Sequence, residues 1–196
     1  MRTETINIYK FNELPEKVQE KIIESWRDND EPHFAGEIED TLKVLEKLLH
    51  VTVKEWSYDD DNYSFKLSDR SGMNGDWSRP AHRLVDEILS SDLPCKIYRK
   101  GYAKTDKTRT SKIFRDSPDD CPWTGVVYDC AFADALKELR RPENYFAWDM
   151  ETFANLVFDN LFSQAKAEYK HWLSAECIKE DIEANDYEFI EGGKIV

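Results

Sequence analysis

The stretch FANLVFDNLFSQAKAEYKHW (residues 153–172) decides the fold class. One set of its side chains recurs every three or four residues, which is the period of an α-helix with a single buried face. Ser174 then favours a helix break and the N-cap of a last short helix. We therefore expect a long helix of about six turns, followed by a short one carrying Ile178 and Ile182. The members of the long buried face are Phe153, Leu156, Val157, Asn160, Leu161, Gln164, Ala165, Tyr169 and Trp172.

Three further helices are predicted upstream of this stretch. Pro15 stands where helices commonly begin, and helical spacing continues from it through Asp28. The second helix covers residues 33–50, and the third follows Pro80. Both show one apolar face, as expected of helices that pack on a core. The apolar residues are Phe34, Ile38, Leu42, Leu45 and Leu49 in the second helix, and Leu84, Val85, Ile88 and Leu89 in the third.

Apolar and polar residues alternate in other segments, which predicts strands. TINIYKF (5–11) is typical of a half-buried strand. VTVKEWSY (51–58) and NYSFKLSD (62–69) flank three consecutive aspartates, so we expect a hairpin with an acidic turn.

Further strands are predicted at residues 95–103 and in GVVYDCAFA (125–133), and the latter should lead into a short helix before Pro142. The last ten residues favour a small hairpin about Gly192 and Gly193. Strands and helices mix without regular βαβ units. We therefore expect a single α+β domain over residues 1–196, with a mostly antiparallel sheet packed with several helices.

Charge bounds the function of the chain. The net charge is −13 and the sequence pI is about 4.8, while hydrophobic residues reach 40%, enough for a buried core. An acidic surface repels nucleic acid and anionic membranes and suits a basic protein surface, although acidity also serves solubility alone. No secretion signal or membrane-length apolar stretch is visible. We therefore expect a cytoplasmic protein whose cysteines are free thiols: Cys95, Cys121, Cys130 and Cys177.

Motifs of known enzymes are lacking in the sequence. There is no GxGxxG, GxxxxGK[ST], HExxH or GxSxG, and the four histidines have no metal-ligand spacing. The aspartates 59–61 lack the EF-hand pattern. We therefore predict a binding protein without catalytic residues, cofactor or metal. The alternative is an enzyme whose site forms only in the fold, in a deep pocket converging on His82, Asp119 or Cys121.

Residues 96–115 form a basic segment in this acidic chain. Eight Lys and Arg stand there against one acid, Asp106, and two tyrosines interleave them. Such a pattern is typical of phosphate contacts combined with base stacking, and pairing with the chain's own acids is the alternative. The candidate nucleic-acid-binding residues are Lys96, Arg99, Lys100, Lys104 and Arg109.

Residues 176–191 form the opposite pattern, with seven carboxylates against Lys179. Carboxylates spaced along a helix resemble the charge of a phosphate backbone and attract a basic nucleic-acid-binding groove, whereas a solvated helix face is the plainer interpretation. Together with the acidic turn they give the candidate partner-binding residues Asp59, Asp60, Asp61, Glu180, Asp181 and Glu183.

The two ends of the chain resemble a protein family. INIYKFNELPEKVQEKIIESWRD (6–28) is similar to a short strand followed by an "F-x-E-L-x-E-x-x-x-E-K" helix in uncharacterised phage and prophage proteins. SAECIKEDIEANDYEFIEGGKIV (174–196) resembles their closing "E-x-I-E-A-N-x-Y-x-F" and Gly turn. Pro15 stands where many members have Ser, and the middle of the chain diverges. The family is sometimes labelled as antitoxins of toxin–antitoxin systems, so the resemblance implies a mobile-element origin and action in a bacterial cytoplasm.

These observations favour a phage-type inhibitor that binds a host nucleoprotein machine, for example a CRISPR effector, through an acidic surface. The first alternative is an antitoxin-like protein that masks one cognate toxin. A further alternative is nucleic-acid binding through residues 96–115, which predicts a steep dependence on salt.

Overall fold

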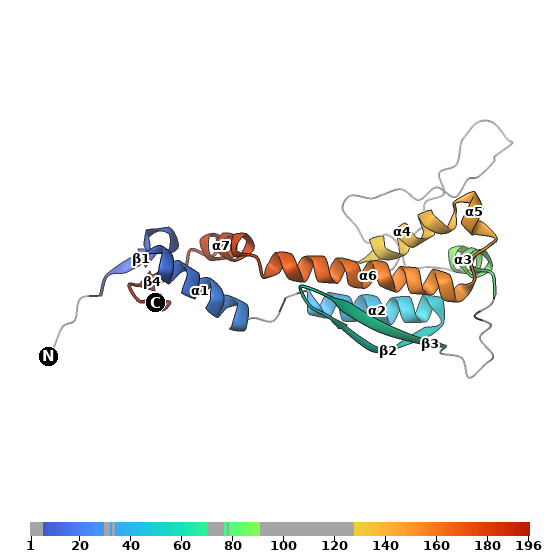
Figure 1. The fold of residues 1–196 in the computed structure, drawn as a ribbon, viewed down its shortest axis with the longest axis horizontal. Coiled ribbons are helices and arrows are strands. Elements are labelled where there is room, and N and C mark those ends of the chain that lie inside the picture. Colours follow the sequence, from blue (N-terminus) through green and yellow to red (C-terminus); the bar gives the residue numbers. More distant parts are fainter. Residues whose placement is uncertain (1–5, 30–31, 33, 70–76, 78, 91–127) are drawn as a thin grey trace, which may run out of the picture. The chain divides into compact units, whose positions relative to one another are not determined.

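The computed structural model describes residues 6–29, 32, 34–69, 77, 79–90 and 128–196 (Figure 1). The strand expected at 95–103 and the basic segment 96–115 lie outside the described residues. The chain divides into two compact units, residues 1–33 with 167–196 and residues 34–166. Each combines helices with an antiparallel strand pair, so the α+β class with antiparallel pairing is confirmed. The single domain over 1–196 stays a prediction.

The first unit is built from two segments that are far apart in the sequence (Figure 1). One segment gives β1 (Ile8–Lys10), the 3-10 helix η1 (Phe11–Glu13) and α1 (Glu16–Asn29), and the other gives α7 (Ala175–Ala184) and β4 (Glu188–Ile190). The strands pair antiparallel with Tyr9 opposite Phe189. The predicted strand 5–11 is thus shorter than expected, because the chain turns into η1 at Phe11.

Aromatic side chains from both segments form the core of the first unit. Phe189 is fully buried and meets Phe11 edge-on, with ring centroids 6.2 Å apart. Trp26 and Tyr187 make a second such pair at 5.3 Å. Burial of these rings stabilises the unit through the area they remove from water. The remaining buried residues of this core are Leu14, Ile22, Ile23, Ile178 and Ile182.

A tight hairpin follows β4, as the sequence predicts. Gly193 N–H donates to the carbonyl of Ile190 over 2.8 Å, and Ile190 N–H donates to the carbonyl of Lys194 over 3.0 Å. Gly193 has a φ of +85°, and a Cβ built on it would lie 3.0 Å from Cγ1 of Val18 and 3.1 Å from Cγ1 of Ile22. Glycine at this position therefore permits both the turn and its close approach to α1.

Gly193→Ala is expected to destabilise the first unit by about 1–2 kcal/mol, because alanine disfavours the left-handed backbone and its methyl group meets α1. Urea unfolding followed by circular dichroism measures the change. Gly192→Ala is the matched control, since a Cβ there meets nothing within 4 Å. Equal stabilities of the two variants would contradict this account of the turn.

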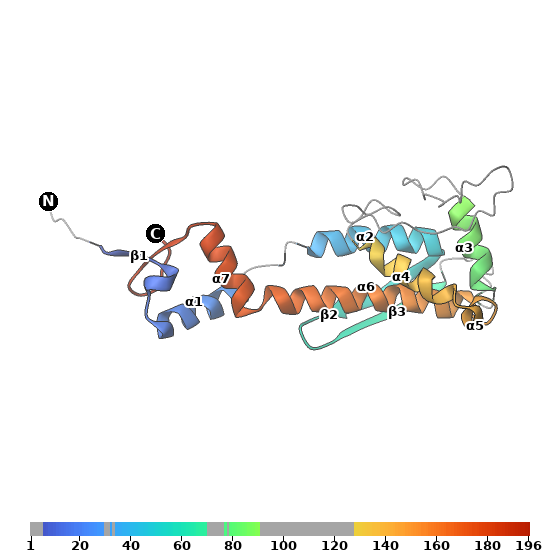
Figure 2. The ribbon, with the colours of Figure 1, turned by 90° about the horizontal axis from the view of Figure 1, so that it is seen from above.

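The second unit is organised along α6 (Met150–Trp172), which continues into the first unit. Figures 1 and 2 show α2, α4 and the β2–β3 hairpin lying along this helix. Its fully buried residues are Phe153, Ala154, Val157, Phe158, Leu161, Phe162 and Ala165. The other elements are α2 (Ala35–Leu49), β2 (Val51–Tyr58), β3 (Tyr63–Asp69), α3 (Ala81–Ser90), α4 (Asp129–Leu139) and α5 (Pro142–Tyr145).

The β2–β3 hairpin packs on α6 through stacked aromatic rings. Trp56 and Phe65 are cross-strand neighbours, and their ring centroids lie 5.8 Å and 5.4 Å from that of Phe162. Phe65 also lies 6.3 Å from Phe158. These contacts explain why Phe158 and Phe162 are buried although the predicted apolar face of the helix does not include them. The hairpin covers a second side of α6.

A hydrogen bond also ties this hairpin to α6. The hydroxyl of Tyr63 donates to Oδ1 of Asp159 over 2.7 Å. This bond and the adjacent negative charge raise the pKa of Tyr63 to about 12. The hydrogen bond therefore stabilises the neutral, protonated form of the Tyr63 phenol.

Tyr63→Phe is expected to lower the free energy of unfolding by about 1 kcal/mol at neutral pH, because the bond to Asp159 is lost. The pKa of Tyr63 is raised from 10 to about 12 in the fold. Its contribution is therefore complete below pH 10 and is lost as the pH rises from about 10 to about 12. Urea unfolding across this range measures the difference between the two proteins. A difference that stays constant up to pH 12 would contradict the assignment.

The strand predicted at 125–133 is wrong where the structure describes it, because α4 begins at Asp129. Its buried residues Ala131, Ala135 and Leu139 recur at intervals of four, the spacing of a helix face. The polar members of the predicted face of α6 contact this helix. Asn160 Nδ2 donates to the carbonyl of Ala131 over 3.2 Å, and Cys130 Sγ donates to Oε1 of Gln164 over 3.2 Å.

The other predicted helices are confirmed. α1 begins one residue after Pro15, and α3 begins one residue after Pro80. α2 buries the whole apolar set predicted for it, which is Phe34, Ile38, Leu42, Leu45 and Leu49. Leu84, Val85 and Ile88 of α3 are buried as well.

Candidate interaction surface

Helix α7 positions the predicted acidic residues of the first unit. Ser174 caps it, accepting a hydrogen bond from the Cys177 N–H over 3.2 Å, as the sequence predicts. Ile178 and Ile182 face the core. The side of the helix away from this core carries the exposed side chains Glu176, Lys179, Glu180, Asp181 and Glu183. We call the four carboxylates among them the acidic ridge.

The charge of the acidic ridge is not neutralised by the described part of the chain, where no ion pair reaches its four carboxylates. Asp181 accepts only a neutral hydrogen bond, from Asn185 Nδ2 over 3.0 Å. The pKa of the Cys177 thiol is raised, first by burial and then by the charges of Glu180 and Asp181. The helix thus presents negative charge to solvent, which is the property a basic partner would recognise.

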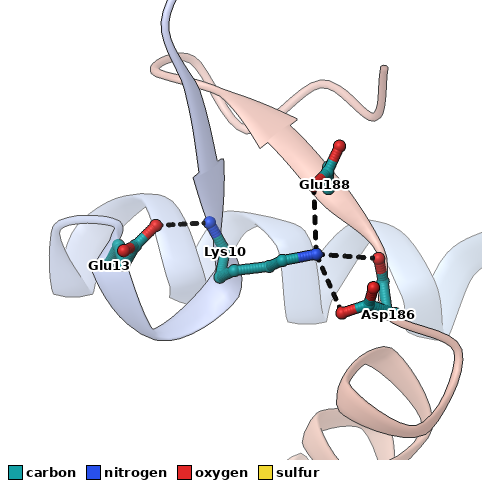
Figure 3. Close-up of polar contacts among 4 residues, drawn as sticks. All are labelled: Lys10, Glu13, Asp186 and Glu188. Atoms are coloured by element: carbon teal, nitrogen blue, oxygen red, sulfur yellow. Dashed lines mark hydrogen bonds and ion pairs between the residues drawn. The ribbon is translucent and has the colours of Figure 1, made fainter.

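Other acids of the same unit are bound within it. Lys10 Nζ lies 2.8 Å from Oδ1 of Asp186 and 3.1 Å from Oε1 of Glu188, and the backbone N–H of Lys10 donates to Glu13 over 2.7 Å (Figure 3). The hydrogen bonds to Asp186 and Glu188 raise the pKa of Lys10 above its ordinary value. This ion-pair group joins β1 to the residues around β4, so these carboxylates have a structural role.

The acidic turn of the second unit is exposed, and one of its carboxylates also stabilises it. Asp59 Oδ1 accepts the N–H of Asp61 over 2.8 Å and that of Asn62 over 2.6 Å. This arrangement stabilises the turn locally, as aspartate does at such positions. All three aspartates have exposed side chains. Of the three predicted contacts in this turn, Asp59 therefore has one carboxylate oxygen bound within the hairpin, whereas the carboxylates of Asp60 and Asp61 are not used in this way.

The predicted site residues fall into separate parts of the chain. Asp59, Asp60 and Asp61 belong to the second unit, whereas Glu180, Asp181 and Glu183 belong to the first. The five basic candidates Lys96, Arg99, Lys100, Lys104 and Arg109 lie outside the described residues, as do Asp119 and Cys121.

His82, the described member of the hypothetical catalytic pocket, packs against aromatic rings. Its Nδ1 lies 3.0 Å from the carbonyl oxygen of Tyr145, and the two rings stack at 4.9 Å. A carbonyl accepts only, so Nδ1 carries the proton of this hydrogen bond. Phe146 approaches the same ring edge-on at 5.4 Å. These contacts fix the start of α3 to α5.

One shallow groove of about 490 Å³ lies in the first unit. Its walls carry both signs of charge, and it contains none of the predicted site residues. The residues lining it are Lys17, Glu20, Lys21, Ile23, Glu24, Arg27 and Ala175. Arg27 is held at its edge by a hydrogen bond from Nε to the carbonyl of Leu173 over 2.8 Å.

Apolar side chains on the open face of the small sheet were not predicted as site residues. Ile6, Ile8 and Val196 are 65%, 50% and 69% exposed. The signal in the sequence is that TINIYKF is apolar on both faces. Tyr9 and Phe11 pack in the core, and the alternating Ile6 and Ile8 point the other way.

Among the described helices, none is long and apolar enough to cross a lipid bilayer. Nor do any three His, Cys, Asp or Glu side chains of the described residues gather in a way that would hold a metal ion. Comparison with known proteins finds no match to this chain among protein-family models, curated proteins or solved structures.

Proposed function

We propose that this chain is a phage or mobile-element protein that binds and inhibits a host nucleoprotein machine, such as a CRISPR effector, in the bacterial cytoplasm. It acts by binding and not by catalysis. The observation that supports the proposal is the acidic ridge, whose carboxylates are exposed and without ion pairs to the described part of the chain. A surface of this kind steers a basic groove toward it and competes there with nucleic acid.

Neutralising the ridge tests the proposal. The partner is first identified by pull-down of the tagged chain from host lysate, with and without nuclease, and mass spectrometry. The triple variant Glu180→Gln, Asp181→Asn, Glu183→Gln is then expected to weaken binding to that partner about tenfold or more at low salt, and the loss shrinks as salt is added. Binding is measured by calorimetry, and inhibition by nucleic-acid cleavage.

The matched control is the triple variant Glu16→Gln, Glu20→Gln, Glu24→Gln, which removes the same charge from α1 of the same unit. It is expected to keep affinity within about twofold, because these carboxylates do not contact the partner and their removal weakens only the long-range attraction. Equal losses of affinity in both triple variants would show that the acidic ridge acts only through the net charge of the unit. Unchanged binding in the ridge variant would refute the proposal.

A second candidate function is an antitoxin that masks one cognate toxin. The observation that favours it is that residues 6–28 and 174–196, which carry the resemblance to the antitoxin-labelled family, fold together into one unit with its own core. A stable one-to-one complex with the product of a neighbouring gene supports this function. Recovery of a large host assembly supports inhibition, and recovery of nuclease-sensitive material alone supports nucleic-acid binding through residues 96–115.

A further inference from the structure

The small sheet of the first unit has one covered face and one open face. Helices α1 and α7 contribute residues to the core around Phe189, which covers one face. Residues directly opposite in antiparallel strands share a face. Ile8 pairs with Ile190, so both side chains lie on the open face. Ile195 pairs with Phe189, and the Val196 N–H donates to the carbonyl of Glu188 over 3.0 Å. Val196 therefore lies on the open face, since it is next to a residue that pairs with the core-facing Phe189. Exposed large apolar side chains grouped in this way are typical of protein-binding surfaces.

β1 is also an edge strand among the described residues. β4 lies between β1 and residues 194–196, because its backbone forms hydrogen bonds with both segments. On the side of β1 away from β4, the Lys10 N–H donates a hydrogen bond to Glu13. The backbone N–H and C=O groups of Ile8 lie on the same side as those of Lys10, because alternate residues of a strand direct these groups to one side. An edge of this kind accepts a further strand, and Glu13 limits the addition to the Ile6–Ile8 end.

The charge of the unit selects the partner. Residues 1–33 and 167–196 contain sixteen Asp and Glu against eight Lys and Arg, a net charge of −8. At the open face, the carboxylates of Asp186 and Glu188 share the one ammonium group of Lys10, so this ion-pair group keeps an excess of negative charge. Two copies of this unit would repel each other, and a basic segment would be attracted.

We propose that the open face and free edge of β1 bind an extended, basic segment of the partner protein by strand addition. The segment forms backbone hydrogen bonds with Ile8 and places alternate apolar side chains over Ile6, Ile8 and Val196. Its basic side chains are attracted by the net negative charge of the unit. This inference rests on the proposed function, because it names where the inhibited partner is held in addition to the ridge.

Titration of the isotope-labelled full chain with a short synthetic peptide of alternating lysine and valine tests this inference by NMR. The expected result is saturable shifts of the Ile6, Ile8 and Tyr9 amides. Ile8→Asp and, separately, Val196→Ser are each expected to weaken binding about tenfold. Val196→Ser changes an exposed side chain outside the core, so it does not depend on tolerance of Ile8→Asp by the fold. Lys43→Ser, at an exposed position of α2, is the control with unchanged affinity.

Three outcomes overturn the inference. One is the absence of shifts at β1 at millimolar peptide, and another is equal binding of a peptide in which glutamate replaces lysine. The third is a concentration-dependent dimer that Ile8→Asp abolishes, which would assign the edge to a second copy of the chain. If the peptide shifts only α7, and the ridge variant alone loses the natural partner, the proposed function stands and strand addition fails. If neither surface affects the natural partner, both fail.

Discussion

Phe162→Ala is expected to lower the free energy of unfolding by about 3–5 kcal/mol, the cost of emptying a fully buried aromatic site. Phe162 is 0% exposed and contacts both Trp56 and Phe65. Its removal leaves a cavity where the hairpin meets α6, and the two strands cannot close it without losing their other stacking contacts. Urea unfolding followed by near-ultraviolet circular dichroism measures the loss.

Phe146→Ala is the control for this substitution. It removes the same side chain from a position that is 78% exposed and leaves no cavity, so the loss is expected to stay near about 1 kcal/mol, the value of its edge-on ring contacts with His82 and Tyr145. A Phe162→Ala protein with the stability of the Phe146→Ala protein would show that the hairpin does not pack on α6 as described.

Phe189→Ala is expected to unfold the first unit at room temperature. The ring is 0% exposed and lies at the centre of the contacts between β1, η1 and α7. A unit of about 60 residues buries a small share of its surface and has little stability to lose, and truncating such a ring costs about 3–5 kcal/mol. Amide hydrogen exchange is the measurement: protection should vanish in α1 and α7 while it persists in α2.

Ile195→Ala is the matched control, because Ile195 bridges Phe189 across the tail hairpin but is 43% exposed. It should leave protection of α1 and α7 nearly unchanged. Loss of protection throughout the chain in Phe189→Ala would show that the two units unfold together, which favours the predicted single domain.

Local patterns predicted the helices of this protein well, because a helix depends on residues that are close in the sequence. The extent of α6 and the Ser174 cap of α7 are examples, whereas the buried face of α6 also includes Phe158 and Phe162, which the local pattern missed. The strand prediction at 125–133 was wrong because two local patterns compete there. Tyr128 and Phe132 are strand-prone residues, but Ala131, Ala135 and Leu136 follow at helical spacing, and packing on α6 decides between the two patterns.

Contacts between distant segments could not be predicted. The alternation in TINIYKF indicates a strand. No nearby residue shows that this strand pairs with β4, in which Phe189 lies opposite Tyr9 and 180 residues further along the chain. The candidate site shows the same limit. Acidic residues were found by counting, yet only the fold shows that Lys10 pairs with Asp186 and that Asp59 closes its own turn, whereas no ion pair from the described residues reaches Glu180.

The first unit has a consequence for how the protein is made. Because β1 and α1 find their core only in residues 175–190, they must leave the ribosome and remain unfolded until those residues have been translated and have emerged. Their exposed isoleucines are then available to chaperones and proteases. Prior folding of residues 34–166 shortens the effective loop that separates the two halves and so lowers the entropy lost when they meet.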